Sequence, residues 1–166
     1  MQISKPILVL NDSGTLVGVH PSQQTKTKWF AIVRLQNNGV AEASFIQVAA
    51  NIGFRKSDPR REEYNFPESA FYYVQPPPTL QPFIYTGAVA DTEQIGLSPD
   101  VFTIDYSIHR KERFYAWGKI RFSDGLGNRM TPDSEFCRYA NGNAVIDAVL
   151  NAPSGYAKPW QKCSQQ

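Results

Sequence analysis

Residues of two kinds alternate from Arg113 to Ser123, small or apolar at one set of positions and mostly aromatic or basic at the other. One face of this segment carries Phe114, Ala116, Gly118, Ile120 and Phe122, and the other carries Tyr115, Trp117, Lys119 and Arg121. A period of two is that of a β-strand. The turn residues Asp124 to Asn128 follow, and Glu135 to Tyr139 then resume a β pattern. The sequence therefore predicts a β-hairpin.

The first third of the chain predicts four more strands. An apolar run from Ile7 to Leu10 and a shorter one from Thr15 to Val19 flank a turn cluster. From Trp29 to Leu35 every odd position is apolar, which indicates a strand with one buried side. Asn37 to Gly39 end that strand, and we expect the β-like run from Ala43 to Ile52 to pair with it antiparallel.

The middle of the chain is charged and then rich in proline. Residues Arg55 to Glu63 include seven charged side chains and one proline, which predicts a solvated loop or a one-turn helix. Pro76 to Pro78, with Pro82 close behind, disfavour a ladder strand. We interpret this stretch as a connection that crosses between two sheets, rather than as a domain linker, and expect a strand from Phe83 to Val89.

Two patterns compete between Ser98 and Arg113. Ser98 and Pro99 resemble the start of a helix, and a basic cluster from His109 to Lys111 suits its end. Against this, the residues from Phe102 to Ile108 alternate with a period of two, and we favour the strand. Asn143 to Leu150 predicts either a last strand or a short helix.

These elements together predict an all-β fold. About seven to nine strands without a repeat of 20 to 50 residues favour an immunoglobulin-like antiparallel sandwich, with a jelly roll as the alternative. The chain of 166 residues suffices for one domain, which we place at residues 1–150. We expect residues 151–166 to form an irregular C-terminal tail.

Composition excludes several classes of function. A net charge of +2, scattered along the chain, does not favour a nucleic-acid partner. Apolar runs are far shorter than the ~20 residues that cross a bilayer, so we expect no membrane insertion. The N-terminus lacks the basic and apolar blocks of a signal peptide. We therefore predict that the chain, as given, is soluble.

Two segments resemble a broad set of bacterial extracytoplasmic domains with immunoglobulin-like sandwiches and uncharacterised functions. The first is VRLQNNGVAEA, from Val33 to Ala43. The second is YAWGKIRFSDGLGNRMTPDSEFCRY, from Tyr115 to Tyr139, which is similar to a hairpin with an aromatic-x-Gly-x-Ile strand and a returning Phe-Cys. The resemblance covers about a third of the chain. It implies a periplasmic or cell-surface location and no active site; without it, a cytoplasmic location is the alternative.

Candidate catalytic and metal-binding groups are few. The two histidines, His20 and His109, do not make a metal site, and no nucleotide-binding fingerprint occurs. Asp133 and Glu135, like the pair Asp91 and Glu93, lack the spacing of a calcium loop. We therefore predict a protein without catalysis, metal or cofactor.

The two cysteines, Cys137 and Cys163, leave two alternatives. One is a pair of unpaired thiols, with Cys137 buried in its strand. The other is a disulfide, which would contribute about 3 kcal/mol by restricting the unfolded chain. The compartment decides between them.

The strongest candidate binding surface is the strand face that carries Tyr115, Trp117, Lys119 and Arg121. Exposed aromatic rings beside cations bind peptides or stack on sugars, unless a loop covers them. The preferred function is a non-catalytic interaction or assembly module that binds a protein partner or itself. The alternatives are a glycan-binding module, which would use Tyr115, Trp117 or Trp160, and a structural subunit of a capsid or appendage.

Overall fold

The computed structural model describes residues 5–10, 16–21, 27–74, 83–84, 89–91, 95–96, 111–141, 156–157 and 161–164. Throughout these ranges the chain is all-β, as predicted, and its only helices there are two short 3-10 turns, η1 (Arg61–Tyr64) and η2 (Glu68–Ala70). The same residues contain no apolar helix of the length that a bilayer crossing requires.

The largest sheet, here called the central sheet, is antiparallel in the order β13-β11-β10-β5-β6. Its two long strands are β5 (Ala43–Arg55) and β10 (Arg113–Asp124), and β10 also pairs with β11 (Ser134–Asn141). Short strands complete it: β6 (Tyr72–Tyr73), β13 (Gln161–Lys162) and β7 (Phe83–Ile84), the last paired with the start of β5.

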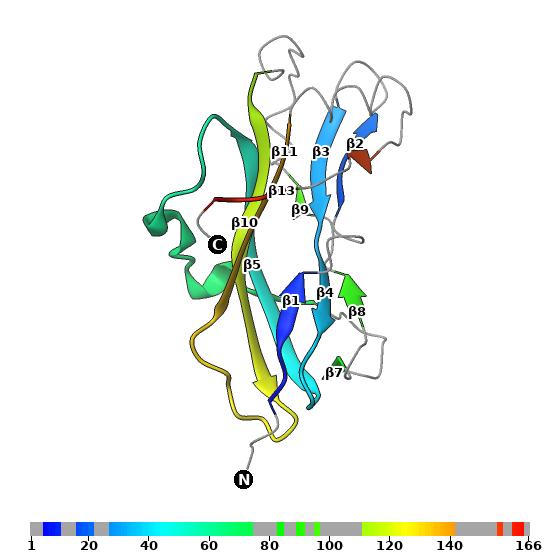
Figure 1. The fold of residues 1–166 in the computed structure, drawn as a ribbon, viewed down its shortest axis with the longest axis vertical. Coiled ribbons are helices and arrows are strands. Elements are labelled where there is room, and N and C mark those ends of the chain that lie inside the picture. Colours follow the sequence, from blue (N-terminus) through cyan, green and yellow to red (C-terminus); the bar gives the residue numbers. More distant parts are fainter. Residues whose placement is uncertain are drawn as a thin grey trace.

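Two smaller sheets form the facing layer. One has the order β1-β4-β8, with β1 at Leu8–Leu10, β4 at Arg34–Asn37 and β8 at Val89–Asp91. The other has the order β12-β2-β3-β9, with β12 at Tyr156–Ala157, β2 at Leu16–Pro21, β3 at Thr27–Ile32 and β9 at Ile95–Gly96. Strands β3 and β4 follow each other closely and stand opposite β5 and β10 (Figure 1).

The main hydrophobic core lies between these layers. Val33 and Leu35, which are fully buried, reach it from the facing layer, whereas Ile120 and Phe122 of β10 reach it from the central sheet. The core is completed by Leu8, Ala43, Ile46, Val48, Val74 and Phe136. The odd positions from Ala31 to Leu35 are buried as their alternation predicts.

The predicted hairpin of β10 and β11 is confirmed, with Arg113 opposite Asn141 and Ile120 opposite Ser134. Asp124 organises its turn, because its Oδ1 accepts hydrogen bonds from the backbone N–H of Leu126 and Asn128, each at 2.9 Å. Gly127 has a φ of +87°, which glycine adopts without steric cost.

The expected antiparallel pairing of the strands on either side of Asn37 to Gly39 is wrong. β4 pairs with β1 and β8, whereas β5 pairs with β10, so the connection crosses from one layer to the other. The buried Asn37 side chain stabilises the crossing: its Oδ1 accepts from the backbone N–H of Ile7 and Gly39, and its Nδ2 donates to the carbonyl of Ala41.

A β-bulge interrupts β5 soon after this crossing. The register shifts between Arg121 and Ser123 of β10, which are opposite Gln47 and Ser44, so Phe45 and Ile46 face a single residue of β10. Phe45 has a φ of +50° and is 55% exposed, while Ile46 turns into the core. A bulky residue in the left-handed region is a genuine backbone outlier.

The C-terminal tail also differs from the expectation of irregular structure. Its described residues include β12, which pairs with β2, and β13, which pairs with β11. Such two-residue strands are too short to produce a visible alternation in the sequence. Residues 98–110, where the helix and strand predictions compete, lie outside the described residues, as do the element expected from Asn143 to Leu150 and the proline stretch.

Gly118 is tightly enclosed at the centre of β10. A Cβ added there would lie 2.1 Å from the carbonyl oxygen of Ala49 and 2.9 Å from the ring of Phe136. The backbone of Ala49 cannot move aside as a flexible side chain could. We therefore expect Gly118→Ala to lower the free energy of unfolding by about 2–3 kcal/mol in a urea titration.

Gly53, in the neighbouring strand β5, is the matched control. A Cβ added there meets nothing within 4 Å, so Gly53→Ala should leave the urea midpoint within experimental error or raise it. Equal losses in the two variants would contradict the role assigned to the close contacts at Gly118.

Candidate functional site

The outer face of the central sheet is the face of β10 that carries the predicted binding residues. Two of them are not available to a ligand, because Tyr115 is 0% and Trp117 is 6% exposed. The prediction of an exposed aromatic surface is therefore wrong for these rings. Lys119 is only partly exposed, and the Arg121 side chain is 13% exposed.

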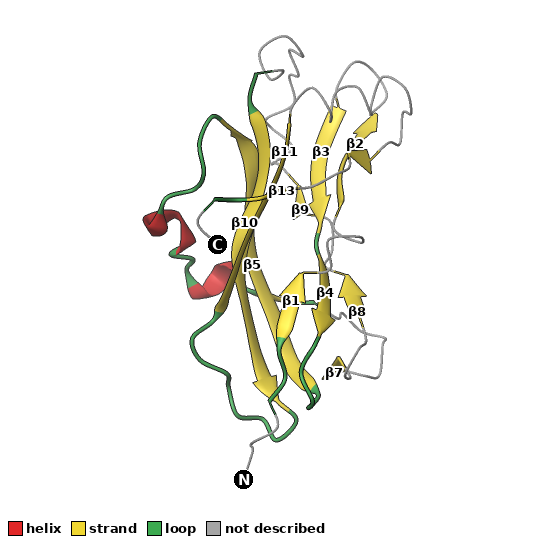
Figure 2. Cartoon of the chain, in the orientation of Figure 1, coloured by secondary structure: helices red, strands yellow, loops and turns green. Residues whose placement is uncertain are grey.

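Residues 56–71, here called the covering segment, cause this burial. The segment contains η1 and η2, which lie on the side of the central sheet away from β3 and β4 (Figure 2). Tyr64 packs with Tyr115 and Trp117 in a second hydrophobic cluster, and Phe66 lies against it. The segment predicted as a solvated loop or one-turn helix does form the turn η1, yet it also closes a second core.

Charged residues attach the covering segment to the sheet. Glu63 pairs with Arg55, and its second carboxylate oxygen accepts from the backbone N–H of Arg60 at 2.6 Å. Trp117 Nε1 donates to the carbonyl of Glu63 at 3.3 Å, and the Arg55 guanidinium stands 5.3 Å from the centre of the Trp117 ring. Hydrogen bonding from Arg55 holds the pKa of Glu63 below its usual value.

Arg121 makes a separate set of contacts at the other end of the covering segment. Its guanidinium pairs with Glu68 of η2 at 2.7 Å and with Asp133 at 3.5 Å. It also lies 3.9 Å from the centre of the Phe71 ring. The predicted cationic residue is thus already engaged within the chain, which argues for a structural role.

Cys137 and Cys163 are joined by a disulfide, the second of the two alternatives left by the sequence. Cys137 lies in β11 and is fully buried, and Cys163 follows β13 and is 5% exposed. Both belong to the cluster of Tyr115 and Trp117. The disulfide therefore fixes the C-terminal residues over the second core.

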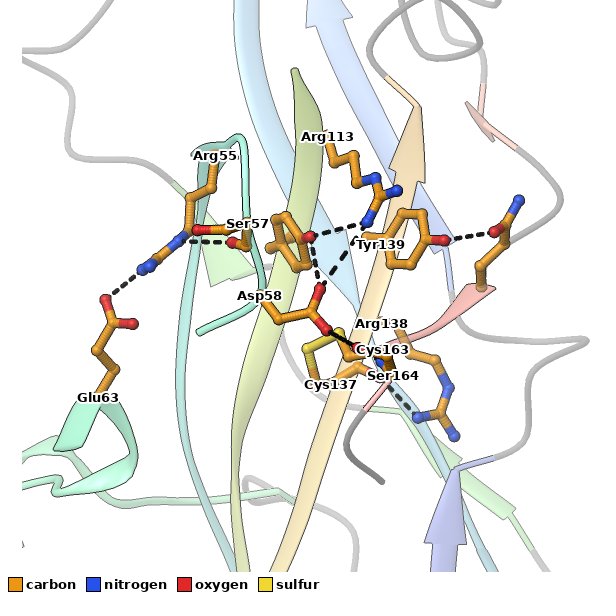
Figure 3. The surroundings of a disulfide bond; sticks show 12 residues. Arg55, Ser57, Asp58, Glu63, Arg113, Cys137, Arg138, Tyr139, Cys163 and Ser164 are labelled. Atoms are coloured by element: carbon orange, nitrogen blue, oxygen red, sulfur yellow. Dashed lines mark hydrogen bonds and ion pairs between the residues drawn. A yellow bond between two sulfur atoms is a disulfide. The ribbon is translucent and has the colours of Figure 1, made fainter. Parts of the chain in front are cut away.

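Asp58 joins three segments beside the disulfide (Figure 3). Its Oδ1 accepts from the hydroxyl of Tyr115 at 2.7 Å, and its Oδ2 accepts from the backbone N–H and the hydroxyl of Ser164 at 3.0 and 2.7 Å. Arg113 stands 4.0 Å away and lies over the ring of Tyr139. A single carboxylate thus connects the covering segment, β10 and the C-terminal residues.

The pKa values in this region reflect burial and these bonds. Burial by itself would raise the pKa of Asp58, but the hydrogen bonds from Ser164 and Tyr115 and the charge of Arg113 lower it below its ordinary value. Burial, with the nearby charges of Glu135 and Asp58, raises the pKa of Tyr64 to about 12. Both shifts follow from the packing of these side chains in the second cluster and beside it.

The remaining candidate residues do not assemble into a reactive site within the described part of the chain. Asp133 pairs with Arg129 as well as with Arg121, and Glu135 pairs with Arg61. Across the same residues, no three His, Cys, Asp or Glu side chains gather as a metal site requires. His109, Glu93 and Trp160 lie outside the described residues, as do the side chains of His20 and Asp91.

Comparisons with protein-family models, with curated proteins and with solved structures found no match.

Asp58→Asn tests the role of this carboxylate through the pH dependence of stability. Because folding lowers the pKa of Asp58, its ionised form stabilises the fold above the unfolded-state pKa of about 4, and this contribution disappears as the pH falls through the lower folded-state pKa. We expect the variant to lose about 1–2 kcal/mol at pH 7 and to show a flatter loss of stability toward pH 2 in urea titrations.

Glu62→Gln is the control, since Glu62 is an exposed residue of the same segment. It should stay within about 0.5 kcal/mol of the wild type at pH 7. If the free energy of unfolding of the wild type and of Asp58→Asn decreased in parallel toward pH 2, the assigned role of Asp58 would be contradicted.

Proposed function

We propose that this chain is a non-catalytic interaction or assembly domain, and that it contacts a protein partner through one end of its two-layer fold. The contact end is formed by residues 5–8, 38–45 and 123–128. These segments adjoin one another, since Asn38 and Val40 donate backbone hydrogen bonds to Ile7 and Lys5, and Ser44 Oγ donates to the carbonyl of Asp124. They lie at the end near the N-terminus in Figure 1.

Large apolar side chains gather at this contact end. Ile7, Val40, Phe45 and Leu126 are all exposed, and Leu126 at the hairpin tip is 89% exposed. Single exposed apolar residues are ordinary on protein surfaces, whereas several on adjoining segments are typical of protein contacts. Tyr73 of β6 is the other exposed large hydrophobic residue among those that the structure describes.

Phe45 is the observation that carries the proposal. Its backbone conformation costs of the order of 1–3 kcal/mol in a residue with a side chain. Burial of its ring does not offset that cost, since the residue is more than half exposed. β-Bulges redirect side chains at binding sites, and strained positions concentrate there. Phe45 thus has a strained backbone and an exposed ring. This combination supports a role in binding a partner rather than in folding.

The disulfide supports an extracytoplasmic location. Stable disulfides are rare in cytosolic proteins and common in periplasmic and secreted ones. The same compartment follows from the resemblance of Val33 to Ala43 and Tyr115 to Tyr139 to bacterial extracytoplasmic domains. Two layers of antiparallel strands around one core are compatible with the immunoglobulin-like sandwich of that group, which we retain as part of the proposal.

The glycan-binding alternative cannot use the rings of Tyr115 and Trp117, because both are covered. A role as a subunit of a capsid or appendage would use the same contact end for self-association. The experiment below distinguishes a partner from a further copy of the chain.

A photo-crosslinking amino acid at position 126 tests the contact end. We expect a defined crosslinked product in one of two samples. Irradiation of the purified protein would link two copies of the chain, whereas irradiation of the cells that express it would link the chain to one other protein. Mass spectrometry identifies the product. The same amino acid at position 73, which is also exposed but lies on β6, should give none.

Phe45→Gly, introduced beside the crosslinker, separates binding from folding. Glycine adopts a positive φ without cost, so the free energy of unfolding should change by less than about 1 kcal/mol. The crosslinked product should decrease at least fivefold. A product that persists undiminished in this variant, or that also forms from position 73, would contradict the proposal.

A further inference from the structure

The last described residues, 161–164, form what we call the C-terminal strap. Strand β13 pairs with only two residues of β11, Arg138 and Tyr139, and the backbone N–H of Cys163 donates to the carbonyl of Cys137 at 3.4 Å. The strap lies along the edge of β11 beside the second hydrophobic cluster (Figure 3). It thus covers an edge of the central sheet with a very short ladder.

Among the residues that the structure describes, few noncovalent contacts hold the strap. Gln161, Lys162 and Ser164 are exposed, and only Cys163 is buried. Besides its ladder, the strap has the hydrogen bonds of Ser164 with Asp58 and that of the Tyr139 hydroxyl with Gln161. These bonds are exposed to solvent, so they can open locally. The disulfide is the one covalent link between these described residues and the sheet.

The main core and the long ladders of the central sheet do not depend on the strap. The main core contains no strap residue, and the long ladders of β10 with β5 and β11 are complete without it. The covering segment keeps its own attachments through Arg55, Glu63 and Arg121. Release of the strap can consequently occur as a local event, without unfolding of the two layers.

We propose that the strap is a redox-controlled latch, which is closed when Cys137 and Cys163 are joined and opens when a dithiol reduces them. A thiolate of the dithiol attacks the sulfur of Cys163, the less buried cysteine, and Cys137 leaves as a thiolate that takes up a proton. The second thiol of the reductant then displaces Cys163. Two electrons pass to the protein, which gains two thiols, and the dithiol becomes a cyclic disulfide.

Opening changes what the sheet presents to solvent. The backbone of β11 at Arg138 and Tyr139 loses its outer partner, and Asp58 loses Ser164. An unpaired strand edge is a site where an extended segment of another chain can bind. The redox state of the disulfide therefore determines whether this edge of β11 is covered, independently of the contact end.

Limited trypsin digestion of the full chain, with and without a dithiol, tests the latch. Lys162 lies within the strap, whereas Lys119 lies at the centre of β10 and is cut only when the domain unfolds globally. We expect reduction to raise the rate of cleavage after Lys162 at least about tenfold while cleavage after Lys119 stays unchanged. Mass spectrometry, after denaturation and full reduction of each sample, quantifies both cuts.

Two variants complete the experiment. Cys137→Ser combined with Cys163→Ser should be cut at Lys162 rapidly without reductant, and Ser164→Ala should stay resistant until it is reduced. An unchanged rate at Lys162 upon reduction would overturn the proposal. A parallel rise at Lys162 and Lys119 would also overturn it, because the disulfide would then stabilise the whole domain rather than the strap.

Discussion

Strand β10 must be buried on both of its faces, and the rest of the structure depends on this constraint. One face completes the main core with Ile120 and Phe122, and the other places Tyr115 and Trp117 in the second cluster. A strand with two apolar faces needs a layer on each side. The facing layer supplies one of them, and the covering segment with the C-terminal strap supplies the other.

The sequence predicts the long elements because their patterns are local. The alternation from Arg113 to Ser123 and the turn after Asp124 determine the hairpin without reference to distant residues. Strand pairing is not a local property, and the sequence does not predict it here. The expected partner of β5 is its neighbour β4, whereas the actual partner is β10. The crossing depends on the buried amide of Asn37, and its contacts with Ile7 and Ala41 have no signature in the one-dimensional pattern.

The candidate site was harder to predict, for a physical reason. Tyr115, Trp117, Lys119 and Arg121 have the composition of a binding face, and such a face is equally suited to packing under a loop. Seven charged residues from Arg55 to Glu63 suggested solvent, yet Arg55, Asp58 and Glu63 use their charges to hold the cover in place. The exposed Phe45 follows from a bulge, which depends on the register of two strands and not on the residues of either strand alone.

The topology also affects how the disulfide forms during folding. β5 and β10 are far apart in the sequence, so their pairing is a slow, non-local step, whereas the β10–β11 hairpin closes locally. Cys163 comes after β5, β10 and β11 in the chain, so these long strands are all synthesised before the partner of Cys137. With only two cysteines in the chain, intramolecular oxidation has a single product. The domain can therefore mature in an oxidising compartment without any rearrangement of wrongly paired cysteines.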